Sequence, residues 1–238
     1  MKIIDFILSN KEYFENYISR STYHTNAIEG STLTYAETYA LLFNDNSFQV
    51  KAEPREIYEA INHKDALSYM LKHIEEPLSK TFVVSLAKKI NQNINEISGY
   101  RTVSVFIRGA EHIPPEPNEI DQKMMYFFFN YDRTQYNSVF DKIAYNHIEF
   151  ERIHPFADGN GRTGRLLINY ELLRNDLPPA IIPKDRRTEY FDLLANKDAL
   201  RLSDFVKELS QKEKEVLQTF GFEKFEKRKP QKEEEFER

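Results

Sequence analysis

Apolar residues recur every three or four positions along most of this chain, which is the spacing of one face of a helix. The first such run covers residues 3–18, and a short second helix is expected at 21–30, where Gly30 can end it. The capping pattern Thr34-Tyr-Ala-Glu37 predicts a third helix to about residue 43. Further helices are expected at 53–74, 79–93, 118–131, 135–152, 162–175, 185–195 and 202–217. The pattern therefore predicts a mostly helical protein.

One segment, between residues 98 and 117, has a different period. Val103, Val105 and Ile107 alternate with other residue types, which is typical of a short strand, and Gly109 can turn the chain back. A hairpin of two strands is only marginally stable in water by itself. We therefore expect a small β-hairpin that lies on the helices.

The composition is that of a globular protein. Of 238 residues, 40% are hydrophobic, with 18 Phe and 14 Tyr to fill a core, and only 7 Gly and 10 Pro interrupt the helices. The net charge of −5 gives no electrostatic attraction for nucleic acid or for an anionic membrane. The chain has no cysteine, so disulfide and thiolate chemistry are excluded. No run of 18 apolar residues and no signal-type segment is present, and we expect a soluble cytoplasmic protein.

Candidate chemistry is concentrated in His154-Pro-Phe-Ala-Asp-Gly-Asn-Gly-Arg-Thr-Gly-Arg165. This stretch leads into a predicted helix, whose start offers unpaired N–H donors and about half a positive charge. Two arginines at such a helix start repel it unless an anion is present, and the glycines allow close approach of a ligand. We therefore predict a polyphosphate-binding loop.

Two common phosphate motifs do not explain this stretch. Gly159-Asn-Gly-Arg-Thr-Gly164 matches G-x-G-x-x-G, but the dinucleotide fingerprint needs a preceding strand, and the preceding residues have helical spacing. The P-loop pattern G-x-x-x-x-G-K-[ST] is absent. His147 lies on the apolar side of the preceding helix, and we expect it to be a hydrogen-bonded core histidine.

The stretch matches the Fic signature, H-P-F-x-[D/N]-G-N-G-R-x-x-R, at every specified position, and the chain resembles Fic proteins. This resemblance implies a mostly helical fold and transfer of AMP from ATP, with Mg²⁺, to a Ser, Thr or Tyr hydroxyl of a protein. The implied roles are general base for His154, metal ligand for Asp158, α- and β-phosphate binding for Gly159, Asn160 and Gly161, and β- and γ-phosphate binding for Arg162 and Arg165.

These roles agree with elementary chemistry. A hydroxyl is a poor nucleophile at neutral pH, and an imidazole with an ordinary pKa near 6.5 is suited to removing its proton. Negative charge that develops on the phosphoryl oxygens is stabilised by N–H donors, arginine and Mg²⁺.

Glu29 is a second unusual charge. It lies in the last turn of a predicted helix, where a carboxylate faces the negative helix end unless a cation meets it. The positive charge of Arg165 and the negative charge of Glu29 could relieve each other. Thr25-Asn-Ala-Ile-Glu-Gly30 also matches the Fic inhibitory motif [S/T]-x-x-x-E-[G/N]. The resemblance is to the class with an N-terminal inhibitory helix, in which this glutamate pairs with the second motif arginine.

The resemblance also implies contacts outside the signature. In Fic proteins a β-hairpin flap covers the active site and pairs with the target segment, and Ile107, Arg108 and Gly109 would lie at its tip. Tyr190 lies where Fic proteins place an aromatic ring against adenine. Asn196 is near a position that contacts the base, although the spacing departs from the family by about one residue.

We therefore expect an all-α Fic fold with a small β-hairpin flap. Residues 1–94 would be an N-terminal helical region with the motif at 25–30, residues 95–223 the Fic core, and residues 224–238 a charged tail. The expected function is protein adenylylation held in check by Glu29, with a protein as partner and no nucleic acid or membrane. Homo-oligomerisation is left open.

Other functions share these site residues. The chain could be a de-AMPylase in which Glu29 positions water, or it could use another nucleotide or a phosphocholine donor. A Fic kinase carries Lys where this chain has Gly161, which disfavours that activity. A non-catalytic nucleotide-binding regulator is the alternative from a different class, but it would not need His154.

Overall fold

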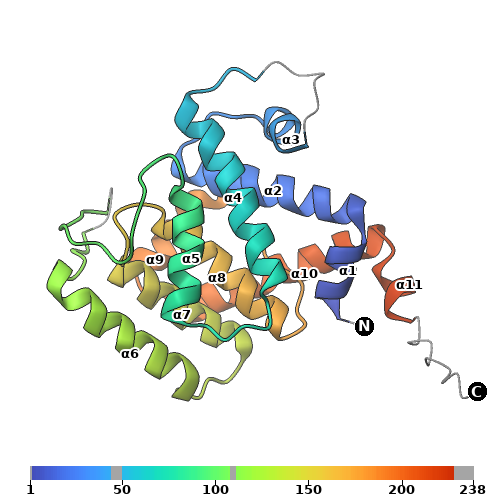
Figure 1. Cartoon of the computed structure of the whole chain (residues 1–238). Coiled ribbons are helices and arrows are strands. Elements are labelled where there is room, and N and C mark those ends of the chain that lie inside the picture. The colour runs from blue at the N-terminus through green and yellow to red at the C-terminus, as the bar shows by residue number, and fades with distance from the viewer. Residues whose placement is uncertain (1, 44–49, 108–110, 228–238) are drawn as a thin grey trace, which may run out of the picture.

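A computed structural model describes residues 2–43, 50–107 and 111–227, and its regular secondary structure there is entirely helical. The predicted helical class is therefore confirmed. Figure 1 shows the arrangement. In chain order the helices are α1 (Ile3–Ser9), α2 (Lys11–Glu29), α3 (Tyr35–Phe43), α4 (Pro54–Lys72), α5 (Lys80–Asn91), α6 (Ile120–Arg133), α7 (Val139–Ile153), α8 (Asn160–Arg174), α9 (Arg187–Ala195), α10 (Ala199–Thr219) and α11 (Phe222–Glu226). Two 3₁₀ turns, η1 (Pro117–Glu119) and η2 (Lys184–Arg186), precede α6 and α9.

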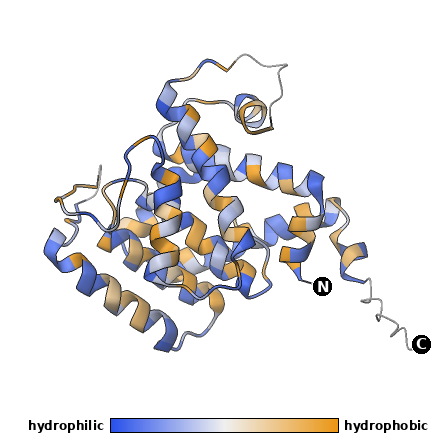
Figure 2. Cartoon of the chain, viewed as in Figure 1, coloured by the Kyte–Doolittle hydropathy of each residue, from blue (hydrophilic) through white to orange (hydrophobic). Residues whose placement is uncertain are grey.

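Helix α8 occupies the centre of the structure (Figure 1) and contacts α2, α4, α5 and α7. Most of its residues are buried, as expected for a helix surrounded by others. The outer helices carry both hydrophobic and hydrophilic residues (Figure 2). The phosphate loop predicted from the sequence therefore leads directly into the central helix.

The N-terminal helices share a hydrophobic core with α8. Ile7, Tyr17 and Leu67 belong to the same buried cluster as Leu166 and Tyr170 of α8. Helix α11 closes this cluster, since its Phe222 ring lies 5.3 Å from the ring of Phe6 in an edge-on contact. The N-terminal region is thus packed against the loop-bearing helix, which allows its side chains to reach the loop.

The first two helices are divided differently from the sequence-based prediction. The break lies at Asn10, so α2 runs without interruption to Glu29, and the expected break between residues 18 and 21 is wrong. Asn10 has an extended backbone, and its Oδ1 accepts a hydrogen bond from the Tyr13 N–H at 3.0 Å. This N-cap starts a new helix because it satisfies an N–H that has no partner within the helix.

Several sequence signals for helix ends are confirmed. Gly30 ends α2 with φ +106°, a conformation that favours glycine. The Thr34 hydroxyl accepts from the Glu37 N–H, and the Glu37 carboxylate accepts from the Thr34 N–H, which is the predicted capping box. Residues 199–219 form one continuous helix, α10, which includes the predicted helix at 202–217. Helix α11 extends to Glu226, so the expected tail begins in a helix.

The strand predicted near residues 103–107 is not seen in the described part of the segment. The side chain of Arg101 explains the difference, because its Nη1 donates to the Val103 carbonyl at 2.9 Å and its Nη2 donates to the Pro115 carbonyl. A β-ladder would need such carbonyls to face a neighbouring strand. The two sides of the segment are therefore joined here through a side chain. Arg108 and Gly109 lie outside the described residues.

Within the three described ranges, no helix combines the length and the apolar character needed to cross a bilayer.

Candidate active site

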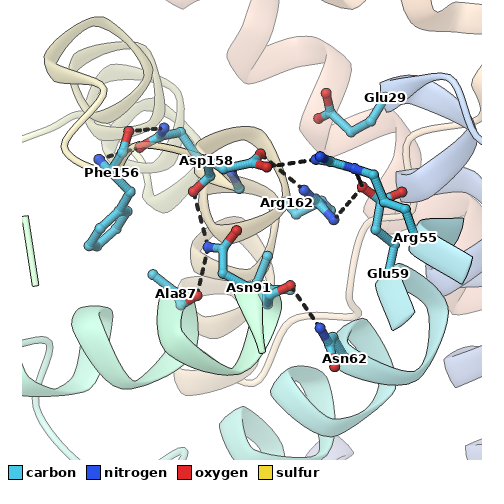
Figure 3. A network of polar contacts seen from close by, with 12 residues as sticks. Glu29, Arg55, Glu59, Asn62, Ala87, Asn91, Phe156, Asp158 and Arg162 are labelled. Carbon is cyan, nitrogen blue, oxygen red and sulfur yellow. Dashed lines mark hydrogen bonds and ion pairs between the residues drawn. The ribbon is translucent and has the colours of Figure 1, made fainter. Parts of the chain in front are cut away.

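The loop between α7 and α8 is held in one shape by a glycine and by hydrogen bonds. Gly159 has φ +77°, and a Cβ there would lie 2.7 Å from Ile90 Cγ2 and 2.8 Å from Asn91 Nδ2. The Asn91 amide donates to the Asp158 carbonyl at 3.1 Å (Figure 3). Any other residue at position 159 would be strained and crowded. The loop thus approaches α5 too closely for a side chain.

Asn160 braces the loop from inside. Its Oδ1 accepts from the Phe156 N–H at 2.9 Å, and its Nδ2 donates to the Phe156 carbonyl at 2.8 Å (Figure 3). Both polar atoms of the Asn160 side chain are therefore occupied by hydrogen bonds to the main chain of Phe156. Of the predicted phosphate contacts of Asn160, only the backbone N–H is left for a ligand in this arrangement.

The start of α8 is left free for an anion. Its N-cap is Gly159, no side chain caps the helix, and its first turn holds no acidic residue. A helix start leaves several N–H groups unpaired and carries about half a positive charge. These donors converge where the sequence predicted phosphate binding.

The two motif arginines are buried, and each retains unused donors. Arg162 is 3% exposed and Arg165 is 6% exposed. Among the described residues, Nε and Nη1 of Arg162 and Nη1 of Arg165 make no hydrogen bond. Arg162 Nη1 does lie 3.2 Å from Glu59 Oε1, so it is ion-paired without good hydrogen-bond geometry. Buried donors are nearly always satisfied in proteins, so these groups indicate an anionic ligand.

Glu29 and Arg165 form the ion pair expected from the sequence. Arg165 Nη2 lies 2.6 Å from Glu29 Oε1, and Arg165 Nε donates to the Thr25 hydroxyl at 2.7 Å. Burial acts to raise the pKa of Glu29, but the charge and hydrogen bond of Arg165 outweigh it and lower the pKa. A Cβ on Gly161 would lie 2.5 Å from Glu29 Oε1, so this glycine leaves room for the pair.

His154 has the features of a neutral base. It follows α7 in a left-handed conformation with φ 50°, and its Nδ1 lies 3.2 Å from the Glu151 carbonyl. A carbonyl can only accept, so Nδ1 carries the proton and Nε2 keeps a lone pair. Burial lowers the pKa of His154, and the nearby charge of Arg101 adds to this, outweighing the bond to Glu151. The lowered pKa favours the neutral form of the imidazole.

The donor set fits a cation that arrives with phosphates. Asp158 Oδ2 lies 2.6 Å from Arg55 Nη2, and Asp158 Oδ1 lies 3.3 Å from Arg162 Nη2. No group of three or more acidic, histidine or cysteine side chains that could hold a metal occurs in the described part of the chain. Mg²⁺ is commonly held by one or two carboxylates together with substrate phosphates. Asp158, one carboxylate next to the predicted phosphate-binding loop, meets that requirement once its contacts with Arg55 and Arg162 are released.

A cavity of about 370 Å³ opens between the segment of Ile107 and His112, the C-terminal part of α7, and α9. Ile107, Ile148, Phe191 and Leu194 give it apolar walls, and Glu151 lies on its lining as well. Six of its eleven lining residues are polar or charged, and they include Arg152, Arg187 and Asp192. A cavity lined by both apolar and polar side chains is common in ligand sites. Ile107 from the predicted flap thus lies next to α9.

Tyr190 and Asn196, the other two predicted nucleotide contacts, do not line this cavity. Tyr190 is fully buried, its hydroxyl lies 2.7 Å from His147 Nε2, and its ring lies 5.9 Å from Arg165 Cζ. Its ring therefore packs behind Arg165. Asn196 caps the end of α9, where its Nδ2 donates to the Asp192 carbonyl at 2.8 Å. His147 is a buried core histidine, as predicted, but only its Nε2 is hydrogen-bonded, and its Nδ1 has no hydrogen-bond partner among the described residues.

Four residues of this region were missed by the sequence analysis. Arg101 donates from Nε to the His154 carbonyl at 2.8 Å, and Phe191 lines the cavity. Arg55 and Glu59 contact the loop from α4. Arg55 and Glu59 are spaced i, i+4, which in a sequence is typical of a solvent-exposed helix pair. Only packing against the loop reveals them.

The family of this chain follows from its similarity to known proteins. Residues 77–172 match the Fic/DOC family model. A 188-residue match to the protein adenylyltransferase Fic of Drosophila persimilis is 32% identical and covers 75% of the chain. The chain belongs to the Fic family. It covers only 36% of that relative, so the chain spans little more than a third of such Fic proteins.

Solved Fic structures have the same fold. A Fic domain-containing signaling protein from Bacteroides thetaiotaomicron superposes with a TM-score of 0.73 at 24% identity, over 84% of this chain and 86% of that one. A Fic-1 fragment from C. elegans superposes with a TM-score of 0.70 at 25% identity, over 89% of this chain and 64% of the fragment. The helical arrangement is therefore that of the Fic fold.

Proposed function

We propose that the chain is a protein adenylyltransferase that transfers AMP from ATP to a hydroxyl group of a target protein. The observation that carries this proposal is the set of buried donors without a hydrogen bond on Arg162 and Arg165, at the start of the helix whose preceding loop carries His154. The names of the Drosophila relatives, protein adenylyltransferases, support the same activity. A pure nucleotide-binding regulator would have no use for the base.

The phosphates are bound by the start of α8. The backbone N–H groups of Asn160 and Gly161 face the α- and β-phosphates, and Arg162 and Arg165 neutralise the β- and γ-phosphates. The N–H of Gly159, the third predicted contact, is donated to Asp158 Oδ1 and becomes available only when that carboxylate turns away. When bound, Mg²⁺ at Asp158 would supply additional positive charge for the phosphate oxygens. The loop is already fixed by Asn160 and Asn91, so it requires little reordering on binding.

His154 acts on the incoming hydroxyl. Its Nε2 takes the hydroxyl proton while the hydroxyl oxygen attacks the α-phosphorus, and the bond to the β-phosphate oxygen breaks. The products are the AMP ester of the protein and pyrophosphate. Arg101 holds the main chain of His154, and thereby the ring, in place through the carbonyl.

The cavity between α7, α9 and the flap segment is the proposed site of the base. Phe191, Leu194 and Ile107 offer apolar surface on its lining. Tyr190 supports Arg165 from behind, and Asn196 would reach the base only if the end of α9 moved. The flap, with Arg108 and Gly109, is proposed to dock the target segment.

Glu29 is proposed to keep the enzyme inactive. Its ion pair with Arg165 occupies the cation assigned to the γ-phosphate. ATP would then bind with its α-phosphate out of line for attack, and a displacement of about 1 Å can cost on the order of 10²-fold in rate. The N-terminal region, residues 1–94, would thus regulate the core at 95–223.

Labelled ATP and intact-mass spectrometry test the activity. The chain, its Glu29→Gly variant and the Glu29→Gly/His154→Ala variant are incubated with labelled ATP and cell lysate. We expect label on protein with the Glu29→Gly variant and none with the double variant. Protein modified by the γ-phosphate alone, detected with γ-labelled ATP, would contradict AMP transfer.

A further inference from the structure

Helix α4 contributes two charged side chains to the phosphate loop. Glu59 Oε1 lies 3.0 Å from Arg55 Nε and 3.2 Å from Arg162 Nη1, and both arginines also contact Asp158. The four side chains form a closed ring of alternating charge (Figure 3). The Fic/DOC match begins at residue 77, so Arg55 and Glu59 come from outside the matched domain.

The inner and outer members of this ring differ in burial. Glu59 is 7% exposed and Arg162 is 3% exposed, whereas the side chain of Arg55 is 58% exposed. A buried charge is costly unless it is paired, so Glu59 and Arg162 need each other. Arg55 can turn toward water at little cost. The ring can therefore open at Arg55 but not at Arg162.

Asp158 cannot keep both arginine contacts while it also serves as a ligand of a cation. Its Oδ2 contacts Arg55, and its Oδ1 contacts Arg162 and accepts from the Gly159 N–H. When the oxygens of Asp158 face a cation, Arg55 can leave. Arg162 stays buried, and Glu59 is then the carboxylate that remains to orient its guanidinium.

We propose that Glu59 is a positioning residue of the phosphate site, which holds Arg162 toward the nucleotide once Asp158 faces a divalent cation. The inference rests on the proposed function, because it assigns Arg162 to a nucleotide phosphate. It predicts that removing the charge of Glu59 weakens nucleotide binding more when Mg²⁺ is present than when it is absent. A residue that only stabilises the fold would show no such dependence.

The test is calorimetric titration of ADP into the full chain, once with excess Mg²⁺ and once with EDTA. Glu59→Gln removes the charge and keeps the shape. We expect its affinity for ADP to fall about tenfold with Mg²⁺, because the buried Arg162 guanidinium then loses its remaining ion-pair partner, and less than about threefold in EDTA. In an Arg162→Gln background, Glu59→Gln should cause no further loss.

Glu213→Gln is the matched control. Glu213 is a buried carboxylate paired with Arg20 at 2.6 Å, on α10 and α2, and it makes no contact with the loop. This variant should lower the melting temperature and leave ADP affinity unchanged. Glu59→Asp retains the charge, and it should recover part of the Mg²⁺-dependent affinity even if Glu59→Gln folds poorly.

The outcomes are distinct. Equal losses in Mg²⁺ and in EDTA, or no loss in either, would overturn the positioning role and leave the nucleotide site intact. A wild-type chain that binds no ADP in either condition would overturn the proposed function itself, and this inference with it.

Discussion

At the scale of single residues, substitution of His154 is expected to affect catalysis and to leave nucleotide binding nearly unchanged. Its ring Nδ1 contacts the Glu151 carbonyl, its main-chain carbonyl accepts from Arg101, and its Nε2 has the free lone pair. We expect His154→Ala, made in the active Glu29→Gly background, to reduce transfer by about 10²–10⁴-fold, because a general base acts in the transition state. Calorimetry should show ATP affinity nearly unchanged. Equal loss of affinity and transfer would contradict the assignment.

Glu29 and Arg165 should behave as a switch. Glu29→Gly removes the carboxylate and loosens the last turn of α2, so Arg165 becomes available for the γ-phosphate. We expect incorporation of labelled AMP to rise at least about tenfold, which is the value of one charged hydrogen bond. Adding Arg165→Ala should abolish the gain. A wild type as active as Glu29→Gly would show that Glu29 is not inhibitory.

His63 gives a pH dependence whose sign can be worked out. Burial, together with the charges of Arg165 and Arg162, lowers the pKa of His63 to about 3 in the folded chain, while its Nδ1 contacts the Thr22 hydroxyl. The unfolded chain has a pKa near 6.5, so it takes up a proton below that pH and the folded chain does not. The titration of His63 therefore leaves the free energy of unfolding unchanged above about pH 6.5 and lowers it as the pH falls from 6.5 toward 3.

The measurement is urea unfolding of wild type and His63→Gln at pH 7 and pH 5.5. Wild type should lose about 1 kcal/mol more stability than the variant between these two values, because only wild type has this proton uptake on unfolding. The comparison with the variant cancels the titration of other groups. Identical losses would mean that the folded state accommodates a charged His63.

At the scale of elements, caps decide where helices begin. Asn10 separates α1 from α2 through its bond to the Tyr13 N–H, and its Nδ2 also donates to the Phe220 carbonyl. Asn10→Ala should lower the free energy of unfolding by about 1 kcal/mol, measured by urea titration. Gln218→Ala, at an exposed position on α10, should change it by less than about 0.5 kcal/mol. Equal effects would contradict the capping role.

The loop is the element that the packing constrains most. Gly159 is required by its positive φ and by its closeness to Ile90 and Asn91, and Asn160 is required by its two bonds to the Phe156 main chain. Both residues stand in the motif, but the sequence alone suggested phosphate contact for both. Their side-chain requirements come from packing within the protein.

At the scale of the whole molecule, the proposed role of Asp158 as a metal ligand would join α4, the loop and the nucleotide. We expect Asp158→Ala to weaken nucleotide binding in Mg²⁺, and EDTA to have the same effect on wild type, because a hard cation needs an oxygen ligand along with the phosphates. Calorimetry in both media measures this. If nucleotide affinity and transfer persisted in EDTA, Asp158 would have no metal to hold.

The sequence by itself determined the helical class, most helix positions and the identity of the loop. These depend on local periods, caps and a contiguous motif, and local interactions can be recognised along the chain. His154, Arg162 and Arg165 could be singled out as candidate site residues because all three lie within one twelve-residue motif. Glu29 could be predicted because its helix-end conflict and its motif are both local.

Only the tertiary structure decided which distant side chains complete the site. Arg101, Glu59 and Arg55 reach the loop from segments more than fifty residues away, and no local pattern requires them to do so. Tyr190 is turned inward by its bond to His147, which leaves Phe191 to face the cavity. The orientation of a side chain depends on the burial of its neighbours, and that burial exists only when the helices have packed.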